Sequence, residues 1–148
     1  MKKKNFSCNK VLLFILLFSM PFILSSCYIH RMQNYYSEKE NYITVTGTVS
    51  HMEYNNDKTK LYFSFTDLDY KFPENDFKLF GENLSVALKN GIDEKVTIGT
   101  QVTFTTAPRY FYDYYNMPIV AFSVNEESLL DFEEGYSNLQ EWLKHNEI

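Results

Sequence analysis

Residues 42–54 read YITVTGTVSHMEY, and apolar and small polar side chains alternate along them. A period of two is typical of a strand that has one buried face. Gly47, in the middle of the stretch, indicates a bulge or a sharp local coil. His51 has the same parity as Val49, so we expect it at the inner edge of the sheet. The stretch therefore predicts a half-buried first strand, against which the following residues can pair.

Four further strands are predicted after this one. The turn signal at residues 55–57 and the alternation of Leu61, Phe63 and Phe65 after it favour a hairpin. Aromatic residues make up 18% of the chain, which favours a packed fold over a disordered segment. The expected strands cover residues 59–67, 76–80, 101–106 and 117–124.

A helix is predicted between the third and fourth strands, over residues 82–90. The side chain of Asn83 can cap its N-terminus, because Asn is a preferred N-cap residue. Gly91 suits the left-handed position just after a helix.

This order of elements resembles the OB-fold, a five-stranded, partly open Greek-key barrel with a helix between strands three and four. Three features carry the resemblance: Val45-x-Gly47-x-Val49 in the first strand, the long paired second strand, and Gly99-Thr100-x-Val102 at the start of the fourth. It covers roughly residues 42–125. We therefore expect a mainly β fold of the α+β class, with an OB-like barrel. Another small β-barrel or an α+β sandwich is the alternative.

Residues 126–148 are expected to form a C-terminal helical tail. Asn125 can cap a helix that runs through Phe132, and Gly135 is expected to break it. A last helix then begins at Ser137. Its apolar stripe consists of Leu139, Trp142 and Leu143. The stripe would dock either on its own domain or on another chain.

The N-terminus has the pattern of a secretory signal. Lysines precede an apolar run over residues 11–24, which is shorter than the ~20 residues that a spanning helix needs. Leu24-Ser25-Ser26-Cys27 follows, and it resembles the lipobox of bacterial lipoproteins. The resemblance implies cleavage before Cys27 by a dedicated signal peptidase, for which Leu24, Ser25 and Ser26 are the recognition residues. An uncleaved anchor or an ordinary signal with a chance cysteine is the alternative.

The resemblance also implies a lipid anchor, because Cys27 would carry a covalent diacylglycerol. Residues 1–26 are then the signal peptide, and residues 27–41 are the lipidated N-terminus and a flexible tether. The protein is expected on the outer face of the bacterial cytoplasmic membrane, with a Gram-positive-like surface favoured. Cys8 leaves with the signal and Cys27 is modified, so the mature domain has neither a free thiol nor a disulfide.

Loss of the signal changes the charge of the chain. The whole chain has a formal charge of −5, and Lys2, Lys3, Lys4 and Lys10 lie in the signal, which has no acid. Removing these four leaves 10 basic residues against 19 acidic ones, a net charge of −9. Such a surface repels phosphate backbones, so we expect no nucleic-acid partner. It repels anionic lipid too, so membrane attachment is expected to come from the anchor.

An aromatic loop between Pro108 and Pro118 is the candidate ligand-binding segment. Its residues are Arg109, Tyr110, Phe111, Tyr112, Tyr114 and Tyr115. In an OB-fold the loop between strands four and five borders the ligand face. Exposed aromatic rings could stack on bases, sugars or prolines, and Tyr suits protein recognition. The alternative is that the rings fold back and cap the mouth of the barrel.

Other residue groups give weaker signals. Oxygen ligands close in sequence could hold Ca²⁺, but their spacing does not match an EF-hand loop, and solvated loop acids are the favoured interpretation. These acids are Asp67, Asp69, Glu74 and Asp76. The three histidines, His30, His51 and His145, lack metal-ligand spacing, so no metal site is expected.

The sequence contains no linear catalytic motif, neither a Gly-x-Ser-x-Gly nor a P-loop. We therefore expect a non-catalytic binding or accessory module for an envelope protein, a peptide or a glycan, with no cofactor beyond the lipid. The alternatives are a structural lipoprotein acting through the C-terminal helical tail and an enzyme of unrecognised type. The oligomeric state is left open.

Overall fold

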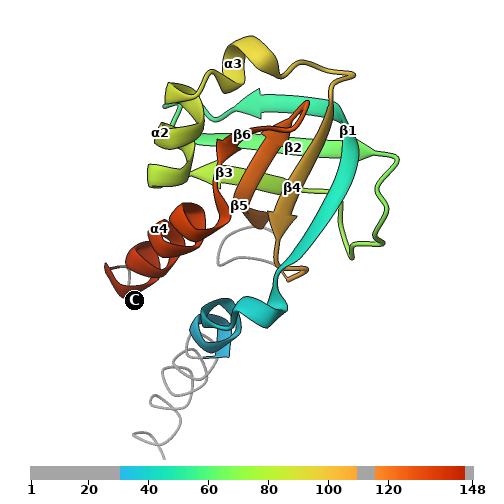
Figure 1. The fold of residues 1–148 in the computed structure, drawn as a ribbon. Coiled ribbons are helices and arrows are strands. Elements are labelled where there is room, and N and C mark those ends of the chain that lie inside the picture. Colours follow the sequence, from blue (N-terminus) through green and yellow to red (C-terminus); the bar gives the residue numbers. More distant parts are fainter. Residues whose placement is uncertain (1–30, 110–115, 146–148) are drawn as a thin grey trace, which may run out of the picture.

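One mixed α+β unit contains all six strands of the computed structural model, which describes residues 31–109 and 116–145 (Figure 1). The strands are β1 (Ile43–Tyr54), β2 (Lys60–Thr66), β3 (Phe77–Phe80), β4 (Gln101–Thr106), β5 (Met117–Val124) and β6 (Glu127–Leu130). Their order in the sheet is β3-β2-β1-β4-β5-β6, and neighbours in this order are antiparallel. β3 also pairs in parallel with β5, through Phe77 with Met117 and Lys78 with Pro118.

The first strand confirms the alternation that the sequence predicts, with one change of phase. Val45 and Val49 are buried, but the register with β2 shifts between Val49 and His51. The extra residue at this bulge reverses which parity faces the core. His51 is therefore exposed, contrary to the expectation of an inner position, and Met52 packs against the core instead.

Gly47 has a different role from the expected bulge. It pairs in regular register with Val102 of β4. A Cβ atom at residue 47 would lie 2.8 Å from Cδ2 of Leu68 and 3.2 Å from Cβ of Phe65. The missing side chain lets the loop after β2 lie directly on β1, where Thr46 N donates to Asp69 Oδ1 at 3.1 Å.

The helices are α2 (Gly81–Lys89), α3 (Ile92–Lys95), α4 (Phe132–His145) and the 3-10 helix η1 (Lys39–Asn41); residues 31–37 are helical as well. α2 follows β3 as predicted, and Gly91 adopts the expected left-handed conformation after it. Asn83 is not the N-cap, because the helix begins two residues earlier and Phe80 holds that position. Within the described ranges, no helix is long and apolar enough to cross a membrane.

The chain after β5 differs from the expected helical tail. Asn125 and Glu126 both have positive φ, and residues 127–130 return as β6, which pairs with β5. Two consecutive left-handed residues are typical of a two-residue hairpin turn. The sheet therefore has six strands where five were expected. Gly135 does not break a helix, since α4 runs through it without interruption.

Two hydrophobic cores result. The larger lies on the inner face of the curved sheet, where the rings of Phe65 and Phe104 stack at 4.4 Å and Phe63 contacts Phe122 at 5.4 Å. The smaller lies on the outer side of β5, under α4 and residues 31–37; its buried members are Met32, Tyr36, Ala107, Val120, Leu139 and Leu143. The apolar stripe of the last helix thus packs on its own domain.

Met32 and Tyr36, which lie in the segment where we expected a flexible tether, belong to this smaller core. Tyr36 is fully buried and Met32 is 5% exposed. Burying side chains of this size stabilises a fold by roughly 1.5–3 kcal/mol each. Figure 1 shows this segment beside α4, at the end of the molecule opposite α3.

Candidate functional site

Most of the residues singled out in the sequence for binding or attachment lie outside the described ranges. These are Leu24, Ser25, Ser26 and Cys27 at the N-terminus, and Tyr110, Phe111, Tyr112, Tyr114 and Tyr115 in the loop. Arg109 is described, and so are the residues that surround both ends of that loop. The structure therefore shows the residues that border the candidate site.

Arg109 lies at the start of the loop, against the N-terminal segment. Its guanidinium carbon is 4.3 Å from the centroid of the Tyr35 ring, which is a cation–π geometry. The hydroxyl of the neighbouring Tyr36 donates to the Arg109 carbonyl at 2.5 Å. Asn41 Nδ2 donates to the Tyr35 carbonyl at 2.8 Å, which holds that turn of backbone in place. Side chain and main chain of Arg109 are thus both held by residues 35 and 36.

The other end of the loop is fixed by the sheet. The Met117 amide donates to the Asp76 carbonyl at 2.9 Å, and Met117 is fully buried beside Phe77. The described residues on the two sides of the loop are therefore both anchored to the domain.

Two more aromatic residues extend this border. Tyr70 is 42% exposed, and its ring contacts Phe72 at 4.7 Å. Phe72 in turn contacts the buried Phe77 at 4.9 Å. Burial raises the pKa of Tyr35, the Arg109 charge opposes this, and nearby Tyr70 adds to the rise in pKa. Tyr35, Tyr70, Phe72 and Arg109 are called the aromatic border below.

A buried amine lies on the same strand that anchors the loop. Lys78 is 2% exposed, and its Nζ is 5.0 Å from the centroid of the Phe80 ring. Phe80 contacts the chain's single tryptophan, Trp142 of α4, at 5.4 Å in an edge-to-face arrangement. Strand alternation places Lys78 and Phe80 on the outer face, opposite Phe77. The sequence alone did not identify Lys78 as buried, because the elements that cover the outer face of β3 lie far along the chain.

The acidic and histidine candidates do not come together. Asp67, Asp69, Glu74 and Asp76 are exposed, and Asp69 is used to hold the loop on β1. His51 lies 3.3 Å from Glu53 on the surface, and His145 follows Glu141 by one helical turn. Nowhere in the described ranges do three His, Cys, Asp or Glu side chains form a potential metal site. His30 lies outside those ranges.

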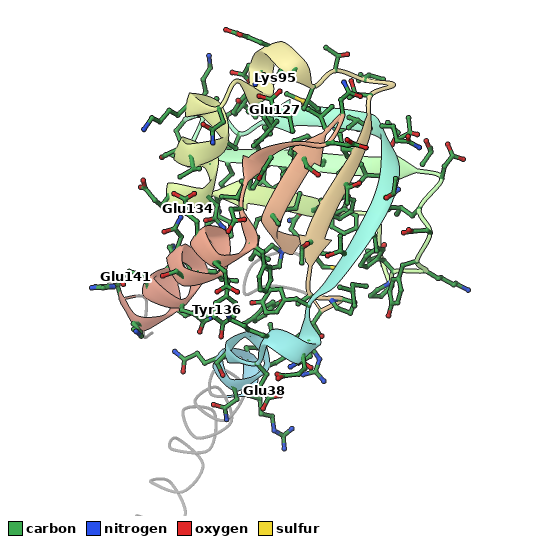
Figure 2. All side chains as sticks on the ribbon, viewed as in Figure 1. Glu38, Lys95, Glu127, Glu134, Tyr136 and Glu141 are labelled. Atoms are coloured by element: carbon green, nitrogen blue, oxygen red, sulfur yellow. The ribbon has the colours of Figure 1, made fainter. Side chains whose placement is uncertain are left out.

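The described part of the chain also has surface grooves that the sequence did not predict. One, of about 430 Å³, lies between α2, α3 and β6 and contains Lys95, whose amine is 2.6 Å from Glu127 (Figure 2). A second, of about 350 Å³, is lined by Thr46, Thr103 and Ser123 on the outer face of β1, β4 and β5. A third, of about 200 Å³, lies between residues 33–37 and α4.

Comparisons with protein-family models, with curated proteins and with solved structures found no match for this chain. The chemistry of the candidate site is therefore inferred from the residues that form it. Its aromatic rings and its arginine are of residue types that are enriched where proteins bind other molecules.

Proposed function

We propose that this protein is a lipid-anchored extracytoplasmic module that binds an envelope protein, a peptide or a glycan without catalysing a reaction. In this proposal Cys27 carries the diacylglycerol, and the aromatic loop with its border is the binding surface. The domain would sit on the outer face of the cytoplasmic membrane. The domain itself is proposed to be an OB-like barrel with β6 and α4 added at its C-terminus.

The strand pairings support the OB-like assignment. β1 pairs with both β2 and β4, and α2 lies between β3 and β4 in the chain. The parallel pairing of β3 with β5 joins the two ends of the five-strand set, which is the contact that a closed barrel requires.

The observation that carries the binding proposal is the aromatic border at the base of the Tyr-rich loop. Tyr70 is exposed, Tyr35 and Phe72 are half-buried, and an arginine stacks on Tyr35. A loop that served only to cap the barrel would need no exposed ring or cation beside it. Flat aromatic faces next to hydrogen-bonding groups suit peptide side chains and sugar rings alike.

Site-specific photo-crosslinking in intact cells tests this proposal. A photoreactive phenylalanine analogue replaces Tyr70 in one strain and Ile98 in a control strain. Ile98 is 69% exposed and lies outside the aromatic border, next to the turn that precedes β4, so it samples a different surface. We expect an adduct from position 70 and none from position 98.

A further variant of the position-70 strain tests whether the loop itself contributes to binding. Replacing Tyr112, Tyr114 and Tyr115 together with Ser should remove the adduct, with the thermal unfolding midpoint unchanged. For a glycan partner, retention of the purified domain on isolated cell-wall polysaccharide should fall in parallel. Equal crosslinking at both positions, together with unchanged retention, would contradict the proposal.

The alternative, a structural lipoprotein that acts through its C-terminal helix, has less surface available. Leu139 and Leu143 are buried against the chain's own domain, and Trp142 contacts Phe80. A partner that used this stripe would have to displace the helix from the sheet.

A further inference from the structure

Residues 31–42 pack against the domain instead of forming the expected flexible tether. They are called the connector below. Apart from the burial of Met32 and Tyr36, the connector makes side-chain hydrogen bonds with α4 along its length. Gln140 Nε2 donates to the Tyr36 carbonyl at 2.7 Å, the Tyr136 hydroxyl donates to the Ser37 carbonyl, and Gln33 Nε2 reaches the Leu143 carbonyl at 3.4 Å.

The end of the connector nearest the sheet is fixed as well. Lys39 forms an ion pair with Glu133 and lies over the ring of Tyr136, at 5.1 Å from its centroid. The Tyr42 hydroxyl donates back to the Tyr36 carbonyl at 2.8 Å. Bonds at both ends of the connector mean that it moves with the domain.

This packing sets an upper limit on the distance between the domain and the proposed attachment point. Four residue steps separate Cys27 from Arg31, and a chain spans at most about 3.6 Å per residue, or roughly 14 Å in total. The bilayer's headgroup layer is itself roughly 5–8 Å thick on each side. The end of the domain that carries residues 31–37 must therefore lie at the membrane surface.

A surface groove lies at that end of the domain. It is the cavity of about 200 Å³ between the connector and α4, lined by Gln33, Asn34, Ser37, Gln140, Leu143 and Lys144. The lining has one amine and no carboxylate, and the exposed Glu38 and Glu141 follow two of its residues in the chain. The ammonium group of Lys144 is a suitable donor to the phosphate oxygens of a headgroup, while the Gln33 and Gln140 amides and the Ser37 hydroxyl already donate within the fold.

We propose that the bilayer surface docks against this end of the molecule, so that the domain is held in one orientation. The connector and the C-terminal half of α4 then face the headgroups, and α3 points away from the membrane. Figure 2 shows this polarity, with Glu38 and Tyr136 toward one end and Lys95 and Glu127 at the other. The inference rests on the proposed lipid anchor at Cys27.

Spin labelling of the anchored protein tests the orientation. Because Cys27 would be blocked by lipid, a single cysteine placed elsewhere can be labelled selectively. Glu141→Cys on α4 and Glu94→Cys on α3 are a matched pair, since both positions are exposed glutamates on helices at opposite ends. The protein is extracted from membranes and reconstituted in vesicles of phosphatidylcholine, phosphatidylglycerol and a nickel-chelating lipid.

We expect the nickel lipid to relax the label at position 141 several-fold more than the label at position 94. A ten-residue Gly/Ser insert between His30 and Arg31 adds a span of about 17 Å r.m.s., and it should largely remove the difference. Equal relaxation at both positions, in protein whose Cys27 carries lipid by intact mass, overturns the orientation and leaves the anchor standing. Mature protein without lipid on Cys27 overturns both.

Discussion

Gly135 of α4 lies directly against the backbone carbonyl of Val120 in β5, so closely that a Cβ at residue 135 would be 2.0 Å from that oxygen. Asn83 of α2 reinforces the contact, because its Nδ2 donates to the carbonyls of Gly135 at 3.1 Å and Ile119 at 3.3 Å. One helix backbone, one strand and one buried amide therefore meet at a single point. The docking of the last helix depends on it.

Gly135→Ala is expected to destabilise the domain, even though alanine favours helix. The new methyl group would meet a backbone oxygen, which cannot rotate away as a flexible side chain can. Overpacking of this kind typically costs about 1–3 kcal/mol and sometimes more. Urea unfolding measures the loss. Ser137→Ala, on the exposed side of the same helix, is the control, and it should leave the unfolding free energy unchanged or slightly higher. Equal stability of the two variants would mean that α4 is not seated on β5.

Asn83→Asp is expected to make stability depend on pH. The variant places a carboxylate against two carbonyl oxygens in a buried site, which raises the pKa of residue 83 in the folded state above the unfolded value of about 3.9. Folding is then least affected below about pH 4 and is weakened as pH rises through the folded-state pKa. Urea midpoints at about pH 4 and about pH 7, relative to the parent protein, check this. Asn34→Asp, at an exposed position, is the control, and its urea midpoint relative to the parent protein should be the same at both pH values.

Tyr36→Ala is expected to release the N-terminal segment and to lower stability by about 3–5 kcal/mol, the range for removing a buried aromatic side chain. Tyr36→Phe keeps the ring and loses the hydrogen bond to the Arg109 carbonyl, so its loss should be about 0.5–1.5 kcal/mol. Hydrogen exchange of amides 31–42 provides the second measurement. Exchange should accelerate strongly in the alanine variant; unchanged protection there would contradict the rigid connector.

Two tyrosines predict a loss of stability at alkaline pH. Burial raises the pKa of Tyr42, and its neighbours Tyr136 and Tyr35 raise it further. Burial also raises the pKa of Tyr54, and the hydrogen bond that its hydroxyl donates to Asp93 at 2.6 Å adds to the effect. A raised phenol pKa means that stability is complete below about pH 10, the unfolded value, and is lost as pH rises beyond it.

The comparison of Tyr54→Phe with the parent protein isolates one of these groups. Between about pH 9 and about pH 11, the unfolding free energy of the variant should fall less steeply, because one titrating group is absent. Asp93→Asn should change the slope in the same direction by weakening the hydrogen bond. Parallel slopes in all three proteins would exclude a role for this pair.

The parts of the fold that sequence reasoning predicted are those whose signal is local. Alternation over residues 43–49 and 61–65 and the left-handed Gly91 each depend on neighbours within a few residues. The bulge after Val49 is not visible in this way, because it exists only in the register between two strands. Because of this bulge, His51 lies on the surface, where the sequence predicted an inner position.

The remaining differences have two origins. One is a local turn: residues 127–130 return along β5 after Asn125 and Glu126, although their composition does not distinguish a strand from a helix. The other is contact between distant segments. Tyr36 is ordered by Gln140, 104 positions away. At the candidate site, Arg109 could be identified from its loop, whereas Tyr35 and Tyr70 are brought to it only by the folded chain.

The stacking of Arg109 on Tyr35 brings together the N-terminal segment and the base of the aromatic loop, which lie far apart in the sequence. The helical turn that leads toward the proposed attachment point also supports the base of the proposed recognition loop. A partner that is itself confined to the plane of the membrane would lie close to a loop in this position. Confinement to that plane raises the effective concentration of any partner that shares it, so weak contacts through a few aromatic side chains would be enough to maintain an association.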